Sequence, residues 1–321
     1  MATMQTSLAN SIDAAGDAAK LDASAKSMMK HRSILAKILK ECTTEFKDYD
    51  LKYIEKNCFV SEVTVSRVAV DQDVLDTDAA IVGANSEDTS KKEGTIHYDI
   101  VFDAAIPDTD MIVRMIINLE IQVDTNLKYA VVTRGIYYGA RLISRQKGTV
   151  FAHSDYHKIQ KVYSIWICPD AKGKTANSIA KYGITQQEIY GKVDEALENY
   201  DKLSVIVINL NDEGMKSENE IIGFLSTLLS TSISVETKKK DLEEKYHFEM
   251  TKEIEEDAID MCNIGTATLL KGKAEGAQKK AIEMAIKLLQ RGRDSIEEIA
   301  ELTDLPLETI KELSVSISTS E

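Results

Sequence analysis

The sequence contains few of the residues that mark secreted, fibrous or zinc-stabilised proteins. Its four cysteines, Cys42, Cys58, Cys168 and Cys262, are scattered and form no CxxC pair. No apolar signal segment precedes them, so we expect free thiols in the reducing environment of the cytoplasm. Only 3 prolines occur in 321 residues, which excludes long polyproline linkers and lets regular structure continue nearly uninterrupted.

Long apolar runs and several common enzyme motifs are also missing. No stretch approaches the roughly 18 consecutive apolar residues of a membrane-spanning helix, so we expect no contact with a membrane. The motifs GxxxxGK[ST], GxGxxG and GxSxG are absent, which argues against a nucleotide-driven motor, a dinucleotide dehydrogenase and a serine hydrolase with a nucleophile elbow. The 5 histidines lack the spacing of zinc ligands.

What the sequence does contain is charge, most of it negative. It has 39 Lys and Arg against 53 Asp and Glu, a formal net charge of -14. A uniformly anionic surface repels phosphate, so this average argues against nucleic acid as a partner. The charge is uneven, however, because the segment 128–161 holds seven basic residues and one acid. We therefore expect a basic stripe on an otherwise acidic protein.

Apolar periodicity predicts an α/β domain in which strands and helices alternate. Alternating residues and short β-branched runs indicate strands, and apolar residues three and four apart indicate amphipathic helices. Turn residues between the second and third strands predict a hairpin, and the last strand is apolar enough to be buried on both faces. Strands are predicted at 58–70, 95–103, 111–123, 161–168 and 203–210, and helices at 27–46 and 128–147.

The predicted domains follow changes along the chain in the pattern of apolar and charged residues. Residues 1–27 are expected to form a flexible extension, 28–212 the α/β domain, 213–293 a helical extension, and 294–321 a helix-turn-helix-like hairpin with its tail. Ser295 and Glu298 have the spacing of a capping box at the start of this hairpin. Its charged side chains are almost all acidic, which favours protein contact over entry into a DNA groove. We therefore expect a homo-oligomer formed through the helical C-terminal part.

Carboxylates on the two strands of the predicted hairpin can converge. Asp99 lies on the first strand, and Glu120 and Gln122 share one face of the second. Two carboxylate oxygens, a backbone carbonyl and waters suit a hard cation such as Mg2+, with Mn2+ as an alternative. Such an ion lowers the pKa of a bound water and stabilises negative charge on a phosphate group. Gln122 can hold or orient the attacking water.

A third acid is expected from the helix at 27–46. Glu41 and Glu45 both lie beside its apolar stripe, and Glu45 has the closer angle, so we assign it as support for the ion. The alternative is that both are solvated at the rim of the stripe. Glu87, in the acidic stretch before the hairpin, is a further acid without an assigned role.

The helix at 128–147 carries the expected basic stripe. Offsets of 0, 4, 7 and 11 place four side chains on one line, which we expect to bind DNA phosphates: Arg134, Tyr138, Arg141 and Arg145. The alternative is that Arg134 and Arg141 neutralise acids inside the protein. Tyr138 and its neighbour Tyr137 are expected to serve mainly in packing.

The order of these features resembles the PD-(D/E)XK nuclease superfamily. More narrowly, several blocks are similar to those of the PD-(D/E)XK nuclease family transposases, which are related to the recombination-promoting nucleases. The resemblance covers about 28–210 and 260–313. It is carried by GTIHYDIVFDAAIP, IINLEIQ, RGIYYGARLIS and KVYSIWIC, and by the C-terminal segments KGKAEGAQKKA and SIEEIAELTDLPLETIKEL.

This resemblance implies a restriction-endonuclease-like core, with a mixed central sheet flanked by helices and an all-helical C-terminal extension. It also implies a metal-dependent DNA endonuclease in which Asp99 and Glu120 bind the ion. Gln122 then occupies the position of the superfamily's lysine, and it lacks the positive charge that a lysine brings. The alternative is a weak or inactive nuclease fold that binds DNA or assembles with other proteins.

Overall fold

A computed structural model describes most of the chain and divides it into two units, one ending at Cys262 and one beginning at Asn263. Each unit is presented separately. The predicted site residues Glu120 and Gln122 lie outside the described residues. The described ranges are 19–60, 63–65, 87–90, 94–97, 99–109, 111–119 and 129–318.

The first unit is built on a mixed sheet whose strand order is β1-β4-β5-β6-β8-β7. The central pairs β5·β6 and β6·β8 are parallel, and the outer pairs are antiparallel. A separate antiparallel pair is formed by β2 and β3. The strands are β1 Thr64–Val65, β2 Glu87–Ser90, β3 Gly94–His97, β4 Ile100–Ala105, β5 Ile112–Leu119, β6 Val162–Cys168, β7 Ser178–Gly183 and β8 Leu203–Asn209.

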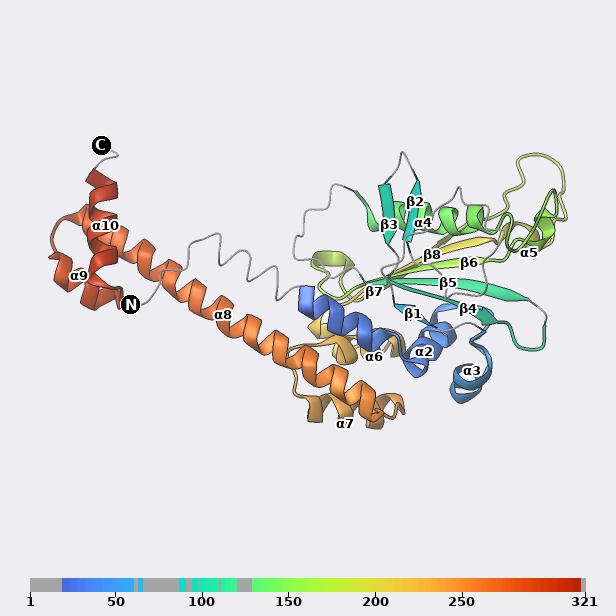
Figure 1. Cartoon of the computed structure of the whole chain (residues 1–321), viewed down its shortest axis with the longest axis horizontal. Coiled ribbons are helices and arrows are strands. Elements are labelled where there is room, and N and C mark those ends of the chain that lie inside the picture. The colour runs from blue at the N-terminus through green and yellow to red at the C-terminus, as the bar shows by residue number, and fades with distance from the viewer. Residues whose placement is uncertain are drawn as a thin grey trace. The chain divides into compact units, whose positions relative to one another are not determined.

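Helices cover both faces of this sheet, as Figure 1 shows with α4 on one side and α2 and α6 on the other. Strand residues alternate between the two faces. Val162 and Trp166 pack with α4, whereas Tyr163 and Ile165 belong to the larger core on the side of α2 and α6. The predicted α/β class with a mixed sheet is therefore confirmed. The helices are α2 Arg32–Cys42, α3 Leu51–Asn57, α4 Val131–Arg145, α5 Leu197–Tyr200, α6 Glu220–Leu229 and α7 Val235–Tyr246, with 3-10 turns η1 Tyr156–Lys158, η2 Gly173–Thr175 and η3 Asp212–Lys216.

The predicted hairpin is present as β4 and β5, which pair from Ile100↔Ile117 to Ala105↔Ile112. The strand predicted at 95–103 is divided, however, because β3 pairs with β2 and the chain bends at Asp99 before β4 begins. Asp99 therefore stands at the junction of two sheets. Of the strand predicted at 58–70, the structure describes only the two-residue β1, and 66–70 lie outside the described residues.

The predicted domain boundaries need two corrections. Residues 19–29 are helical, and Met28 and Met29 are fully buried, so the N-terminal extension is ordered well before residue 27. The helical region after 212 also belongs largely to the first unit. Its helices α6 and α7 and the first turns of α8, which spans Lys252–Arg291, contribute Phe224, Ile254 and Met261 to the main core. Apolar spacing along these helices did not reveal which surface they would cover.

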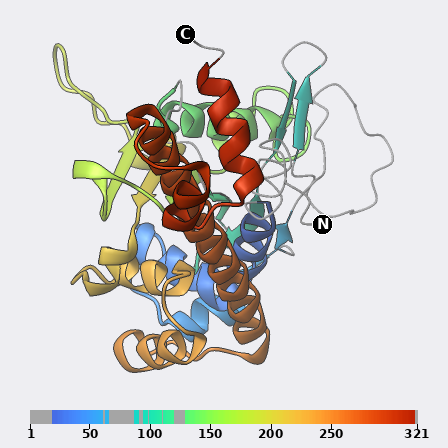
Figure 2. The ribbon, with the colours of Figure 1, turned by 90° about the vertical axis from the view of Figure 1, so that its left-hand side faces the viewer.

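The second unit contains the rest of α8, α9 Ile296–Thr303 and α10 Leu307–Ser318, which pack around a small core that includes Ile299 and Ile310. Figure 2 shows this hairpin in dark red. The predicted capping box is confirmed, because the Ser295 side chain accepts from the Glu298 amide and the Glu298 side chain accepts from the Ser295 amide. Within the described residues, no helix is both long enough and apolar enough to cross a membrane.

Candidate functional site

The end of the β4–β5 hairpin brings the predicted catalytic segments together. Ile100, the first residue of β4, pairs with Ile117 near the end of β5. Asp99 precedes β4, and Glu120 follows Leu119, the last described residue of β5. The first predicted metal ligand and the segment that leads to the second therefore lie at the same end of the sheet. The positions of the Glu120 and Gln122 side chains lie outside what the structure describes.

Asp99 is bound by a cationic side chain that the sequence analysis had left in the N-terminal extension. The Lys26 ammonium lies 2.8 Å from Asp99 Oδ1 and 2.6 Å from Asp22 Oδ2. Burial disfavours the charged form of Lys26, but the charges and hydrogen bonds of Asp99 and Asp22 outweigh it, so the pKa of Lys26 is raised. Both groups are sheltered, with 24% of the Lys26 and 17% of the Asp99 side chain exposed.

The donors at this end of the sheet are compatible with Mg2+. Two carboxylates, Asp22 and Asp99, already converge on one cationic group, and Mg2+ commonly uses one or two carboxylates and fills its other positions with water. Among the residues that the structure describes, no three His, Cys, Asp or Glu side chains form a complete ligand set. The next acid in the sequence after the described part of β5 is Glu120.

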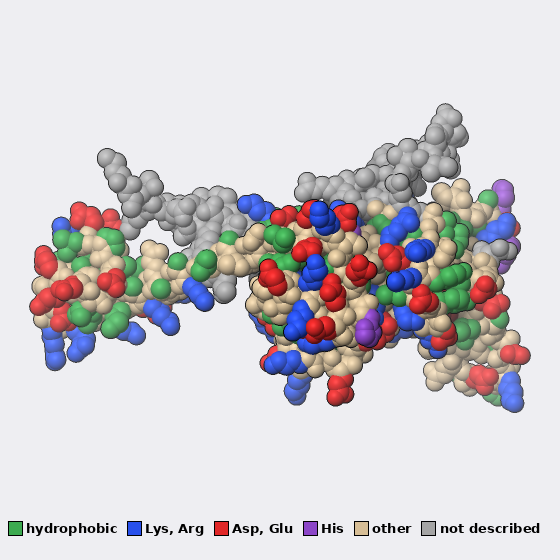
Figure 3. Space-filling model, turned by 90° about the horizontal axis from the view of Figure 1, so that it is seen from below, with side chains coloured by type: hydrophobic (Ala, Val, Ile, Leu, Met, Phe, Trp, Pro, Cys, Tyr) green, Lys and Arg blue, Asp and Glu red, His purple; other side chains and the backbone are tan. Residues whose placement is uncertain are grey.

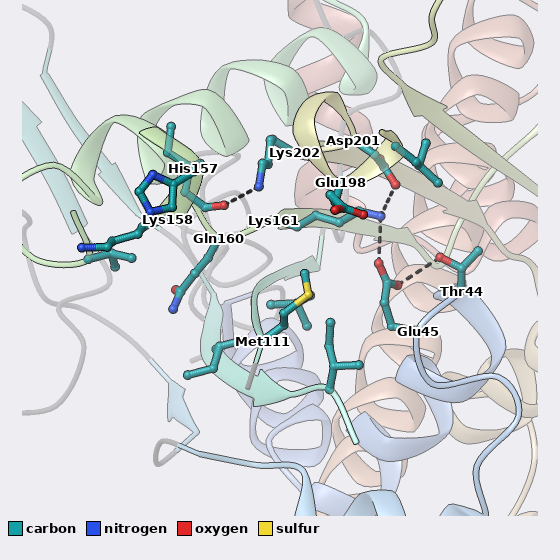
Figure 4. A pocket seen from close by; sticks show the side chains of 16 residues that line it. Thr44, Glu45, Met111, His157, Lys158, Gln160, Lys161, Glu198, Asp201 and Lys202 are labelled. Atoms are coloured by element: carbon teal, nitrogen blue, oxygen red, sulfur yellow. Dashed lines mark hydrogen bonds and ion pairs between the residues drawn. The ribbon is translucent and has the colours of Figure 1, made fainter. Parts of the chain in front are cut away.

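Glu45 lies in a different cluster, at the start of β6 (Figure 4). Its carboxylate accepts hydrogen bonds from Lys161 Nζ at 2.9 Å and from the Tyr163 hydroxyl at 2.5 Å. Lys161 Nζ also lies 2.5 Å from Asp201 Oδ2. Glu45, Lys161 and Asp201 line a cavity of about 630 Å³, whose lining also includes Met111 and apolar neighbours. The arrangement is a sheltered lysine clamped between two carboxylates.

The protonation of this cluster follows from its contacts. Burial alone raises the pKa of Glu45, but the hydrogen bonds from Tyr163 and Lys161 and the charge of Lys161 outweigh it, so the pKa is lowered. The pKa of Lys161 is raised, because bonds to Asp201, Tyr163 and Glu45 exceed the opposing effect of burial. Burial and the adjacent Glu45 carboxylate raise the pKa of Tyr163 to about 12. The cluster is therefore charged and paired at neutral pH.

The assignment of Glu45 to the metal site is corrected by this geometry. The Lys161 carbonyl accepts from the Arg114 amide, and Arg114 pairs with Asp103 in β4. Asp103 is four residues beyond Asp99, which is roughly 13 Å along a strand. Glu45 therefore binds at the opposite end of the hairpin and does not share an ion with Asp99. The spacing of Glu45 on its helix predicted a sheltered carboxylate, but not which end of the sheet it would meet.

The two other acids considered from the sequence have different outcomes. Glu41 lies 4.0 Å from Lys37, which also binds Glu220 at the start of α6. Burial, together with the nearby charge of Glu220, raises the pKa of Glu41. Glu41 thus belongs to the contact between α2 and α6. Glu87 lies in β2, and its side chain is not among those described.

The predicted basic stripe of α4 faces the sheet. Tyr138 and Arg141 are buried, with 7% and 8% of their surfaces exposed, while Arg134 and Arg145 are half-buried. The outer face of the helix instead exposes Ile136 and neighbouring residues. The basic stripe, which was expected to be available to DNA phosphates, is therefore corrected to a buried or half-buried one. Within it, Tyr138 packs edge-on against Trp166. The period of the pattern was right, but a helix that packs on a sheet through Gly135 turns this line inward.

Arg134 lies in the first turn of α4, near the C-terminal end of β6. Its guanidinium carbon lies 5.1 Å from the ring centroids of both Tyr138 and Trp166, and it donates to the Tyr138 hydroxyl at 2.8 Å. Trp166 pairs with Asn118 of β5, one residue beyond Ile117. Arg134 is therefore at the same end of the sheet as Asp99, with its guanidinium fixed by aromatic rings.

Charge on the face of the first unit that is seen from below in Figure 3 is mixed. Figure 3 shows basic and acidic side chains interspersed over the face of this unit that is seen from below. Such a face has no strong preference for an anionic partner, because neighbouring charges of opposite sign cancel over a Debye length.

Comparison with protein-family models, with curated proteins and with solved structures finds no match to this chain. The site is therefore interpreted from its own residues. Lys26 and Asp22 were not among the site residues predicted from the sequence, although their spacing of four residues is a signal of a helical ion pair. No sequence pattern pairs Lys161 with Glu45, because the two are separated by 116 residues.

Proposed function

We propose that the chain is a Mg2+- or Mn2+-dependent DNA endonuclease with a PD-(D/E)XK-like core, of the type found in transposases and recombination-promoting nucleases. One observation carries the proposal: Asp99 stands at the end of the hairpin where β5 leads into Glu120 and Gln122. The crossover from β5 through α4 to the parallel strand β6 supports it, since this is the order of elements that the resemblance implies.

In this proposal Asp99 and Glu120 hold the ion, and Gln122 orients the attacking water. A bound divalent ion would supply Lewis-acid activation of water and stabilisation of charge on the phosphate. The water oxygen forms a bond to phosphorus, the bond to the leaving alcohol oxygen breaks, and that oxygen takes up a proton. The donors at hand fit such an ion, because hard carboxylate oxygens converge on a cation at Asp99.

DNA contacts are proposed for the two half-buried arginines of α4. Arg134 has a fixed guanidinium at the Asp99 end of the sheet, and Arg145 ends the helix. A guanidinium suits phosphate because it donates several hydrogen bonds in one plane. For Tyr138, burial supports the expected packing role. For Arg141, burial supports the alternative of an inward-facing arginine that neutralises acids inside the protein.

The rival function is a weak or inactive nuclease fold that binds DNA or assembles with other proteins. It is favoured by the neutral Gln122 in place of lysine and by the Lys26 ammonium on Asp99, which competes electrostatically with a divalent ion. Titration calorimetry separates the two, because only the enzyme is expected to bind Mg2+ or Mn2+ at micromolar to millimolar concentrations.

The direct test is cleavage of supercoiled plasmid by the purified chain with Mg2+ or Mn2+. Wild-type protein should nick the plasmid, and Asp99→Ala and Glu120→Ala should each lower the rate by about a thousandfold, since the ion loses a charged ligand. Glu45→Gln is the matched control, because it removes a carboxylate at the opposite end of the hairpin. Metal-dependent cleavage that survives both alanine substitutions refutes the site.

We also propose that the helical C-terminal part mediates self-association. Its hairpin exposes Leu302 and Val315, and its other surface residues are mostly acidic, which favours a protein partner over DNA. Light scattering should give a mass above 35.6 kDa for the whole chain and the monomer mass for a chain that ends at Cys262. A monomer in both cases refutes this part of the proposal.

A further inference from the structure

Gln122 occupies the position of the superfamily's lysine and brings no positive charge of its own to the proposed metal site. Glutamine can accept and donate hydrogen bonds, but it cannot offset the negative charge that develops on phosphate oxygens. A cation from another part of the chain can supply this charge if the fold brings it to Asp99. Such a cation would be a sheltered lysine or arginine that contacts Asp99 and is held there independently of it.

Lys26 meets these conditions. Its ammonium lies 2.8 Å from Asp99 Oδ1, and 2.6 Å from Asp22 Oδ2 on its own helical segment. The segment is anchored to the core by Met28 and Met29, which are fully buried. The position of Lys26 is thus set by the packing of its helix and by Asp22 as well as by Asp99.

We propose that Lys26 supplies at Asp99 the positive charge that Gln122 lacks. This inference rests on the proposed endonuclease function and names a further residue of the same site. Lys26 acts on Asp99 in the free protein and on the substrate phosphate once an ion is bound. In the free protein its ammonium holds the carboxylate in one orientation. When Asp99 binds an ion, Asp22 keeps the ammonium beside the site, where it attracts the phosphate backbone.

The arrangement has opposite effects on metal and on DNA. A fixed positive charge close to Asp99 weakens the binding of a divalent cation and strengthens the binding of an anion. A lysine that only neutralises a buried acid also weakens metal binding, but it does not speed cleavage, so a folded Lys26→Met that cleaves at the wild-type rate with saturating metal refutes the inference. Metal affinity and cleavage measured on the same variants therefore distinguish the two roles.

The test compares Lys26→Met, Lys26→Arg and the control Lys30→Met with the wild-type chain. Lys30 is exposed, follows the same helical segment and bonds to Ser27, so its substitution removes one positive charge without touching Asp99. Lys26→Met should bind Mn2+ about tenfold more tightly in titration calorimetry and cleave plasmid about a hundredfold more slowly. Lys26→Arg should restore much of the cleavage, since it keeps the charge, and Lys30→Met should match the wild type.

Chemical denaturation of each variant shows whether a change reflects loss of folding. If Lys26→Met is folded and its Mn2+ affinity equals that of the wild type, the inference is refuted, whatever its cleavage rate. If Lys26→Met does not fold, Lys26→Arg decides, and cleavage and Mn2+ affinity of this variant as low as those of Asp99→Ala refute the inference. A folded wild-type chain that neither binds Mn2+ nor cleaves DNA refutes the proposed function itself and this inference with it.

Discussion

At the scale of single residues, the Lys161 ammonium is held between two carboxylates in a sheltered position. It is 9% exposed and bonds to both Glu45 and Asp201. Replacing it by methionine leaves two sheltered carboxylates facing each other without a cation. We expect Lys161→Met to lower the free energy of unfolding by about 3 kcal/mol in urea denaturation. Lys158→Met, which breaks an exposed pair with Asp155, should leave the midpoint unchanged.

The same cluster predicts a dependence of stability on pH. The folded state lowers the pKa of Glu45 below its ordinary value of 4.5. A depressed carboxyl pKa stabilises the fold fully above the unfolded value, and the stabilisation is lost as the pH falls through the folded value. Wild type should therefore exceed Glu45→Gln in unfolding free energy at pH 7, and the difference should shrink below about pH 4.5. An equal difference at pH 7 and pH 3.5 contradicts the assigned pairing.

At the scale of elements, α4 lies close to the sheet because two of its residues have no side chain. A Cβ atom on Gly135 would lie 2.6 Å from Val205 Cγ1, and one on Gly139 would lie 2.4 Å from Leu203 Cδ1. Alanine favours an exposed helix by about 1 kcal/mol over glycine, but here steric overlap dominates. We expect Gly135→Ala to destabilise the fold by about 1–3 kcal/mol in urea denaturation.

The control for this substitution is Gly276→Ala in α8. A Cβ at Gly276 would have no atom within 4 Å, so only the helical preference of alanine acts there. This variant should have unchanged or slightly increased helicity by circular dichroism. A gain in stability from Gly135→Ala would mean that α4 does not approach the sheet as closely as the structure places it.

At the scale of the whole molecule, the boundary between the units lies inside α8 and not at its start. The first turns of α8 bury Ile254, Ala258 and Met261 in the main core, and Asp257 lies 2.8 Å from His31 Nε2. A chain that ends at Cys262 should therefore unfold cooperatively at nearly the full-length midpoint. A chain that ends at Met250 should lose at least about 4 kcal/mol, because several core side chains are removed. Equal midpoints of the two truncations in urea denaturation contradict the boundary.

The sequence by itself determined the elements whose pattern is dictated by local physics. β8 is nearly continuously apolar, with Ser204 and Asn209 as its polar residues. Such a run favours a strand buried on both faces, and the structure buries residues 204–208. The capping box at Ser295 and the hairpin of β4 and β5 were likewise predictable from the sequence, because turns and caps depend on residues only three or four positions apart. The alternation at 95–103 also drew attention to Asp99, although the structure divides that strand at Asp99.

Only the tertiary structure decided which polar groups meet. Glu45 joins Lys161 across 116 residues, Asp99 joins Lys26, and the line of Arg141 turns inward against the sheet. Periodicity identifies the face of a helix on which a side chain lies, but it does not specify which strand that face covers or which end of the sheet it reaches. Those choices depend on how the helices pack on the sheet, a property of the folded chain as a whole.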